Sequence, residues 1–166
     1  MTGSKPDRRV GWHLALLAVV MMGLAAGPGW SAGPPRLTVV GPEGERVYDM
    51  ADLRALGVTE VTTGTPWTDG VVRFTGVALA QLLGDALPPG GTLRLIALND
   101  YEGVMPVAEL DPSVPVIAYL RNGRPMSVRD KGPFWVVFPF DSAEQYQSEQ
   151  VYSRSVWQLV RIVIEP

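Results

Sequence analysis

Apolar and polar residues alternate over several short stretches of the chain, a pattern that predicts a fold made mainly of β-strands. Residues 58–63 ("VTEVTT") and 155–166 ("SVWQLVRIVIEP") alternate as half-buried strands do, and Leu37 to Val40 predicts a first strand before them. Leu93 to Leu98 predicts a buried strand, and the continuous apolar run "FWVVFPF" predicts one that is buried on both faces.

The stretch "VPVIAYLRNGRPMSV" contains the clearest local signal in the sequence. Two strand-like runs flank Asn122-Gly123, a pair that tolerates the positive φ angles of a type I′ turn. We therefore predict a β-hairpin with Arg121 and Arg124 on either side of its turn.

Two segments carry the start and stop signals of short helices. In "YDMADLRALG", Asp49 is the predicted N-cap and Gly57 the end. In "TGVALAQLLGDA", Thr75 is the predicted N-cap and Gly84 the end. Short strands with a few short helices between them predict an α+β fold, mainly β, in one domain over residues 37–166.

The first 31 residues have the pattern of a secretory signal peptide. A basic head precedes an apolar run from Val10 to Ala26, and small residues lead to a predicted cleavage after Ser31. The protein is therefore expected in the bacterial periplasm, with residues 32–36 as a linker before the domain. Arg8-Arg9 matches a twin-arginine signal only in part. An uncleaved N-terminal anchor is the alternative, and only in that case do we expect contact with a membrane.

Composition excludes several kinds of chemistry. The sequence has no cysteine, and its only histidine, His13, lies in the predicted signal segment. The remaining domain therefore cannot supply a cysteine nucleophile, a Ser-His-Asp triad, a structural zinc site or a histidine-bound haem. The signal takes three of 14 basic and one of 17 acidic residues, which leaves a net charge of −5. This acidic balance argues against nucleic-acid binding, which depends on neutralising phosphates.

Carboxylates, hydroxyls, amides, arginines and one lysine remain, and two polar patches near strand ends are candidate sites. Asn99-Asp100-Tyr101 follows a predicted strand, where such residues either cap a turn or line a pocket. In "TTGTPWT", Trp67 is either the wall of a pocket or a core residue beside a tight turn.

A third patch surrounds the predicted hairpin, in the segment "RNGRPMSVRDKGP". The segment has four basic residues, Arg121, Arg124, Arg129 and Lys131, and one acidic residue, Asp130. Its local charge of about +3 suits the binding of an anion such as phosphate. A solvated hairpin face is the alternative interpretation.

Six segments, taken in order, resemble the molybdopterin-binding domain of sulfite oxidase-type oxidoreductases, and more closely its short, exported, stand-alone members. They are "TPW", "FTGVALAQLL", "LIALNDYEGVMPVAEL", "VIAYLRNGRPM", "KGPFWVVFPFD" and "SRSVWQL". The resemblance covers residues 37–166 and implies an α+β fold with a largely β core. It also implies that catalytic members hold the pterin phosphate with Arg, Lys and backbone N–H groups, and the molybdenum with a cysteine thiolate.

The chain departs from this pattern at the metal ligand. The matching position falls near Thr63 or Gly64, and neither residue replaces a soft sulfur ligand. Ligation of molybdenum by the protein is therefore not expected, although molybdopterin itself stays among the cofactors that the resemblance implies. The resemblance places these residues around one cleft: Trp67, Asn99, Asp100, Tyr101, Lys131 and Arg154.

Three functional hypotheses follow. The first is a periplasmic, non-redox module that binds a small polar or anionic ligand and serves a periplasmic sensor or redox partner. The second is a molybdopterin-dependent oxidoreductase that holds the metal only through the pterin dithiolene. The third is a structural or interaction domain with an empty cleft. The missing cysteine favours the first, so redox catalysis is not expected.

Overall fold

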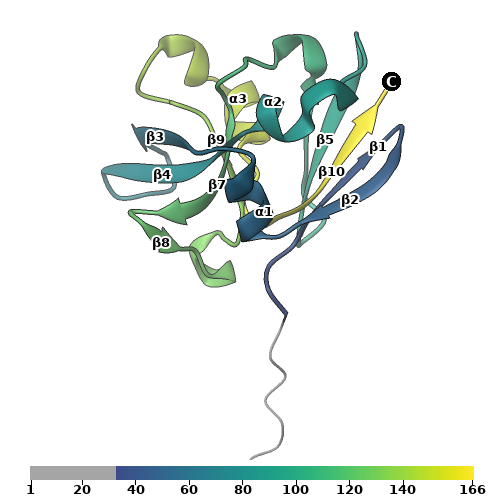
Figure 1. The fold of residues 1–166 in the computed structure, drawn as a ribbon. Helices are drawn as coiled ribbons and strands as arrows, with labels where there is room; N and C mark the ends of the chain where they lie inside the picture. The colour runs from purple at the N-terminus through teal and green to yellow at the C-terminus, as the bar shows by residue number, and fades with distance from the viewer. Residues whose placement is uncertain (1–32) are drawn as a thin grey trace, which may run out of the picture. The chain divides into compact units, whose positions relative to one another are not determined.

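Two sheets of five strands each make up most of the fold, which a computed structural model describes for residues 33–166 (Figure 1). The predicted signal peptide lies outside the described residues. The strands of the first sheet are, in spatial order, β2 (Gly44–Tyr48), β1 (Leu37–Gly41), β10 (Leu159–Glu165), β5 (Thr92–Ala97) and β6 (Glu102–Pro106). Strands β1 and β10 run parallel, and the other neighbours in this sheet are antiparallel.

The second sheet is antiparallel throughout. Its strands are β3 (Thr59–Gly64), β4 (Val71–Ala78), β7 (Val116–Arg121) and β8 (Arg124–Pro125), with β9 (Trp135–Val137) also paired with β7. The inner faces of both sheets contribute to one hydrophobic core, whose largest fully buried side chains include Trp135 and Phe74.

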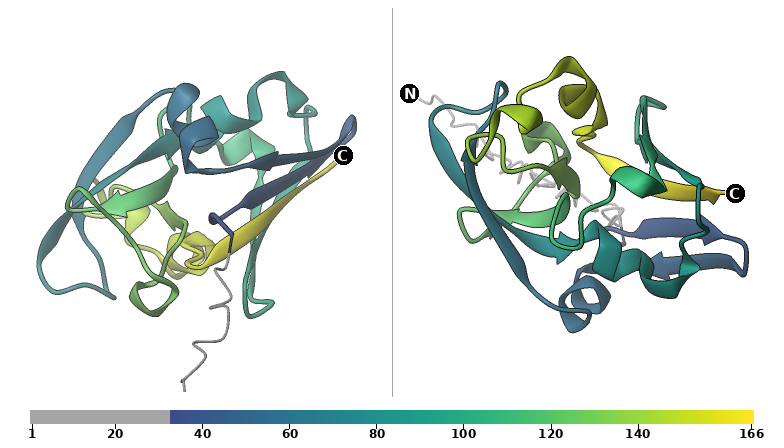
Figure 2. Two further views of the ribbon diagram at one scale, coloured as in Figure 1. Left: turned by 60° about the horizontal axis from the view of Figure 1, so that its bottom comes forward. Right: turned by 90° about the horizontal axis from the view of Figure 1, so that it is seen from above.

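Three short α-helices complete the fold, together with four single turns of 3₁₀-helix. They are α1 (Met50–Ala55), α2 (Leu79–Leu83) and α3 (Glu149–Arg154). Helix α1 contacts β2 of one sheet and β4 of the other, so it bridges the two sheets, as Figure 1 shows. Helix α3, seen from above in Figure 2, precedes β10 and contacts β6. Within residues 33–166, no helix is long and apolar enough to span a membrane.

The fold class predicted from the sequence, α+β and mainly β, is confirmed. The first helix begins where expected, because the Asp49 carboxylate accepts hydrogen bonds from the N–H groups of Ala51 and Asp52. The hairpin turn is also confirmed, since Asn122 and Gly123 have φ angles of 49° and 76°.

Thr75 does not begin a helix, so that prediction is wrong. Strand β4 continues to Ala78, with Thr75 paired to Glu60 on β3 and to Leu120 on β7. The Thr75 hydroxyl donates to the Glu60 carboxylate instead of capping a helix. The β-branched Thr75 and Val77 suit a buried strand, and the helix starts only at Leu79.

Two predicted strands differ in detail from the observed ones. "FWVVFPF" is buried as expected, but only Trp135–Val137 pairs as a strand, and Pro139 lacks the N–H needed to extend a ladder. Leu93 to Leu98 was predicted to be a buried strand, but in β5 buried side chains alternate with half-buried ones. Leu98 lies beyond the end of β5 and is 55% exposed. Strands β2 and β6 and helix α3 were not predicted.

Candidate functional site

The segment Asn99-Asp100-Tyr101 forms the turn between β5 and β6. The N–H of Asp100 donates to the carbonyl of Ala97 at 3.1 Å, and the N–H of Tyr101 donates to the Asn99 side chain at 3.3 Å. Asp100 has a φ of 63°, a left-handed conformation that Asp adopts more readily than most residues. The turn-cap interpretation therefore holds for Asn99 and Asp100.

The same turn also borders a cavity, so Asn99 both caps the turn and lines a pocket. The cavity measures about 340 Å³, which is at the lower end of the range for small-molecule sites. Asn99 and Tyr101 line it, whereas Asp100 is exposed and is not part of the lining. The other lining residues are Trp67, Ala97, Glu149, Tyr152, Ser153, Ser155, Val156 and Trp157.

Aromatic rings form much of the cavity wall. Trp67, in the loop between β3 and β4, has its ring centroid 5.3 Å from that of Trp157 and 5.9 Å from that of Tyr152. The loop that carries Trp67 is fixed by Thr65, whose hydroxyl accepts a hydrogen bond from the Trp67 N–H at 3.1 Å. Behind Trp67, the buried rings of Trp135 and Phe140 lie 6.2 and 6.1 Å away. Both interpretations of Trp67 therefore apply, because it packs on the core and lines the cavity.

Lys131 lies beside the cavity but does not line it. Its ammonium nitrogen is 4.5 Å from the Trp157 ring centroid and 6.0 Å from that of Trp135, within the range of a cation–π contact. Its carbonyl accepts a hydrogen bond from the N–H of Gln158, which fixes this segment against the start of β10. Lys131 therefore contacts Trp157, which lines the cavity, without lining the cavity itself.

Arg154 was predicted to reach into the cleft, and the structure contradicts this. Its guanidinium forms a 2.6 Å ion pair with Glu109 and donates to the Val104 carbonyl at 2.9 Å. Its side chain is 7% exposed, and only its neighbours Ser153 and Ser155 line the cavity. The side chain points to the β6 side of α3 because its two partners lie there.

The arginines of the hairpin lie at a separate place. Arg121 and Arg124 are cross-strand partners, as predicted, and they border a second pocket of about 420 Å³ with Asn122 and Asp130. Arg129 is exposed and does not line it. Among the described residues, none of the three arginines forms an ion pair.

Sequence reasoning missed seven of the ten lining residues, and the largest of these are Glu149, Tyr152 and Trp157. Two of these three lie on α3, whose start is marked by Ser148, the hydroxyl of which accepts from the Val151 N–H. "SEQV" therefore carried an N-cap signal that could have located the helix. Trp157 was within the segment "SRSVWQL", but nothing local indicates that it meets Trp67.

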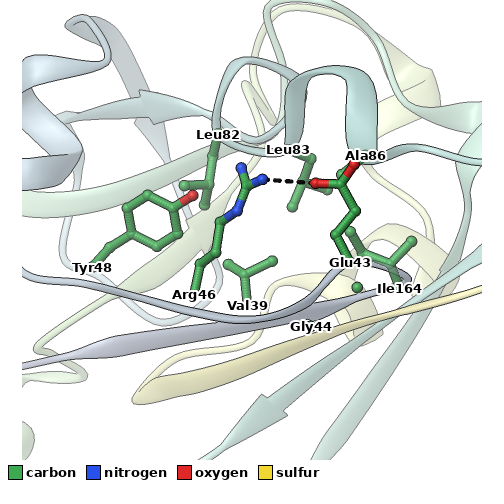
Figure 3. Close-up of a pocket in the computed structure, with 10 residues that line it drawn as sticks. Val39, Glu43, Gly44, Arg46, Tyr48, Leu82, Leu83, Ala86 and Ile164 are labelled. Carbon is green, nitrogen blue, oxygen red and sulfur yellow. Dashed lines mark hydrogen bonds and ion pairs between the residues drawn. The ribbon is translucent and has the colours of Figure 1, made fainter.

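Other polar features of the described region have structural roles. A hollow lies between β1, β2 and α2, and the ion pair of Arg46 with Glu43 borders it (Figure 3). Its volume is about 20 Å³, which is room for one water molecule. Within residues 33–166, no group of three or more acidic or histidine side chains could hold a metal ion.

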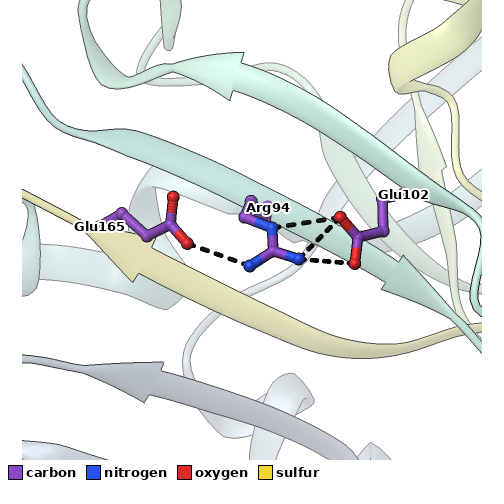
Figure 4. Close-up of polar contacts among 3 residues, drawn as sticks. All are labelled: Arg94, Glu102 and Glu165. Atoms are coloured by element: carbon purple, nitrogen blue, oxygen red, sulfur yellow. Dashed lines mark hydrogen bonds and ion pairs between the residues drawn. The ribbon is translucent and has the colours of Figure 1, made fainter.

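Arg94 on β5 bridges carboxylates on the two neighbouring strands (Figure 4). It pairs with Glu102 at 2.6 Å and with Glu165 at 3.1 Å. The hydrogen bonds with Glu102, followed by those with Glu165, raise the pKa of the Arg94 guanidinium. Since its donors are engaged on both sides, this group joins three strands and is not a ligand site.

Comparison with known proteins supports the fold. No protein-family model and no curated protein matches the chain. Among solved structures, it is similar to the sulfane dehydrogenase SoxCD from Paracoccus pantotrophus, with a TM-score of 0.59 and 20% sequence identity. The match covers 79% of this chain and 38% of that chain, so our chain corresponds to well under half of its length. The fold is therefore of the sulfite oxidase type, as the sequence predicted.

The residues at the position predicted for the metal thiolate do not fit that role. Thr63 is 1% exposed, and its hydroxyl donates to the Gly64 carbonyl and accepts from the Asp141 N–H, each at 3.1 Å. The Asp141 carboxylate in turn accepts from the Gly64 N–H. These groups are engaged with one another, and a hydroxyl is a hard ligand, so the segment does not supply the soft donor that molybdenum would need from the protein.

Proposed function

We propose that this protein is a non-redox module that binds a small molecule in the cavity beside Trp67 and Trp157. The observation that carries the proposal is the cavity itself, which is of ligand size and has aromatic walls with a few polar groups at its edge. Pockets of this composition bury most of a small ligand and orient it with a small number of polar contacts.

The polar groups of the lining support binding without chemistry. The Ser153 hydroxyl donates to the Gln150 carbonyl at 2.8 Å, and the Ser155 hydroxyl donates to the Val136 carbonyl at 2.7 Å. Neither hydroxyl is paired with a group that could act as its general base, which an activated serine nucleophile requires. The only carboxylate in the lining is Glu149, and the lining contains no lysine, arginine or histidine.

The proposal includes the cellular setting expected from the sequence. The module would be exported to the periplasm, where its ligand-bound form would be sensed by a periplasmic sensor or redox protein. The basic hairpin with Arg121 and Arg124 is the candidate surface for such a partner, because its arginines are not engaged in ion pairs within the described region.

The first test is the metal and pterin content of the protein. The full-length chain is expressed in a bacterium that makes molybdenum cofactor, and the exported form is purified. We expect neither molybdenum nor pterin. If each is found at about one per chain, the protein is a molybdopterin enzyme and the proposal is wrong.

The second test asks whether the cavity binds small molecules. A library of cationic, neutral and anionic metabolites is screened by thermal shift against the wild type and against Ser153→Phe, which places a ring in the cavity. Gln150→Phe, on the same helix and outside the lining, is the matched control. Compounds that stabilise the wild type and Gln150→Phe but not Ser153→Phe support the proposal. If none does, the interaction-domain hypothesis replaces it.

A further inference from the structure

Resting on that proposed function, we infer that the ligand is an organic cation whose head group is an alkylated ammonium. Two properties of the cavity lead to this class, the angles between its rings and the sign of its charge.

The rings that line the cavity are steeply inclined to one another and do not form a parallel-walled slot. Trp67 lies at 66° to Trp157 and at 85° to Tyr152. A flat heterocycle stacks best between rings that are close to parallel, and neither of these pairs is. Rings that face a ligand at different angles instead suit a rounded group, and aromatic residues bind such groups in the sites for choline and methylated lysine.

The charge of the lining has the sign that such a group requires. Glu149 is the only charged residue among the ten that line the cavity, and within the described region its carboxylate has no ion-pair or hydrogen-bond partner. Asp100, exposed in the adjoining turn, adds a second negative charge nearby. Aromatic faces attract cations through their quadrupoles, so the rings and the carboxylate favour the same sign of ligand.

The two nearest cations do not reverse this balance. Arg154 is neutralised by Glu109 at 2.6 Å and points toward β6. Lys131 lies over the Trp157 ring but outside the lining. Its contact shows that an ammonium group is accommodated on this ring, while its charge weakens the binding of another cation beside it.

The experiment compares three probes of similar shape and different charge. Choline is the cation, dimethylbutanol is its neutral carbon isostere, and dimethylbutyrate is the matching anion. Isothermal titration calorimetry at constant ionic strength gives each Kd. Tryptophan fluorescence reports whether binding occurs at the site, since Trp67, Trp135 and Trp157 are mutual neighbours. We expect choline to bind most tightly of the three.

Two variants separate charge recognition from simple burial. Glu149→Gln is expected to weaken choline binding by about two- to fivefold, the effect of losing one partly exposed charge pair, and to leave dimethylbutanol unchanged. Glu144→Gln removes an exposed carboxylate outside the lining and is expected to change neither affinity. Lys131→Met keeps the stem on Trp157 and is expected to tighten choline binding by about twofold.

The outcomes also separate this inference from the proposed function. If dimethylbutanol or dimethylbutyrate binds as tightly as choline, or if Lys131→Met weakens choline binding, the cation inference is overturned and the ligand site stands. If the three probes and the metabolite library all fail to bind, the inference and the proposed function fail together.

Discussion

The phenol of Tyr101 donates a 2.8 Å hydrogen bond to the carbonyl oxygen of Ser153, which joins the β5–β6 turn to the end of α3. Both residues line the cavity, so this bond closes one side of it. It also satisfies a carbonyl in the last turn of a helix, where backbone acceptors lack helical partners.

Tyr101→Phe keeps the ring and removes only this bond. We expect the free energy of unfolding to fall by about 0.5 kcal/mol, near the lower end for a hydrogen bond, because Tyr101 is 47% exposed. Hydrogen exchange of the α3 amides should become faster by more than the loss of global stability accounts for. Urea denaturation and hydrogen exchange measure the two effects. Tyr48→Phe is the control, since the Tyr48 hydroxyl has no hydrogen-bond partner among the described residues. Unchanged exchange in α3 would show that the bond does not hold the helix.

Arg154→Met tests whether Arg154 stabilises the fold. The variant loses the ion pair with Glu109 and the bond to Val104, and we expect it to be destabilised by about 1.5–3 kcal/mol. The remaining Glu109 carboxylate is 48% exposed, so water can solvate it and the loss stays below that of a fully buried pair.

Arg161→Met is the matched control for Arg154→Met. The pair of Arg161 with Glu45 is 3.3 Å long and about half exposed, and its loss should cost about 0–1 kcal/mol. Urea denaturation gives both values. Similar losses of stability in the two variants would contradict the buried, structural role of Arg154. If Arg154→Met instead lost ligand binding without being destabilised, Arg154 would belong to the binding site.

The sequence predicted the elements that depend on neighbours in the chain. The type I′ turn needs only Asn122 and Gly123, and the start of α1 needs only Asp49 with the residues that follow it. Thr75 was misassigned because its helix-like surroundings were outweighed by pairing with β3 and β7, which no local pattern reveals.

The cavity was predicted only in part for the same reason. Asn99, Tyr101 and Trp67 were identified from residue type and resemblance, but the bond from Tyr101 to Ser153 spans 52 positions. Arg154 was assigned to the cleft from the resemblance, and its actual partner, Glu109, lies 45 positions away and could not be identified from the sequence. The direction of a side chain on a short helix is set by such tertiary contacts, so it could not be predicted from the sequence.

Asp49→Ala is expected to change how stability depends on pH. Hydrogen bonds from the backbone N–H groups of Asp52 and Ala51 lower the pKa of the Asp49 carboxyl below its ordinary value of 3.8. A group with a lowered folded-state pKa stabilises the fold above its unfolded pKa and loses that contribution as pH falls through the folded value.

The Tm of Asp49→Ala should therefore lie below that of the wild type at neutral pH, and the difference should shrink below about pH 4. Thermal unfolding followed by circular dichroism between neutral and acidic pH measures this difference. Asp69→Ala removes an exposed carboxylate that makes no hydrogen bond within the described region, and its Tm should follow the wild type. A difference for Asp49→Ala that stays constant with pH would mean that the cap stabilises without its charge.

Arg124→Glu tests the electrostatics of the hairpin. Arg121 and Arg124 are direct cross-strand partners, and like charges in such pairs destabilise a sheet, whereas opposite charges contribute about 0.2–1 kcal/mol. The variant should be more stable than the wild type by an amount in this range at low salt. The gain should shrink as salt screens the pair.

Arg129→Glu is the control for the hairpin variant, because it makes the same change in net charge at an exposed residue outside the strand pair. Urea denaturation at low and high salt measures both variants. If Arg129→Glu stabilises the protein equally, the effect comes from net charge alone. If Arg124→Glu instead lowers stability, the two arginines are held together by a compensating interaction, and the basic hairpin then becomes the first place to look for a bound anion.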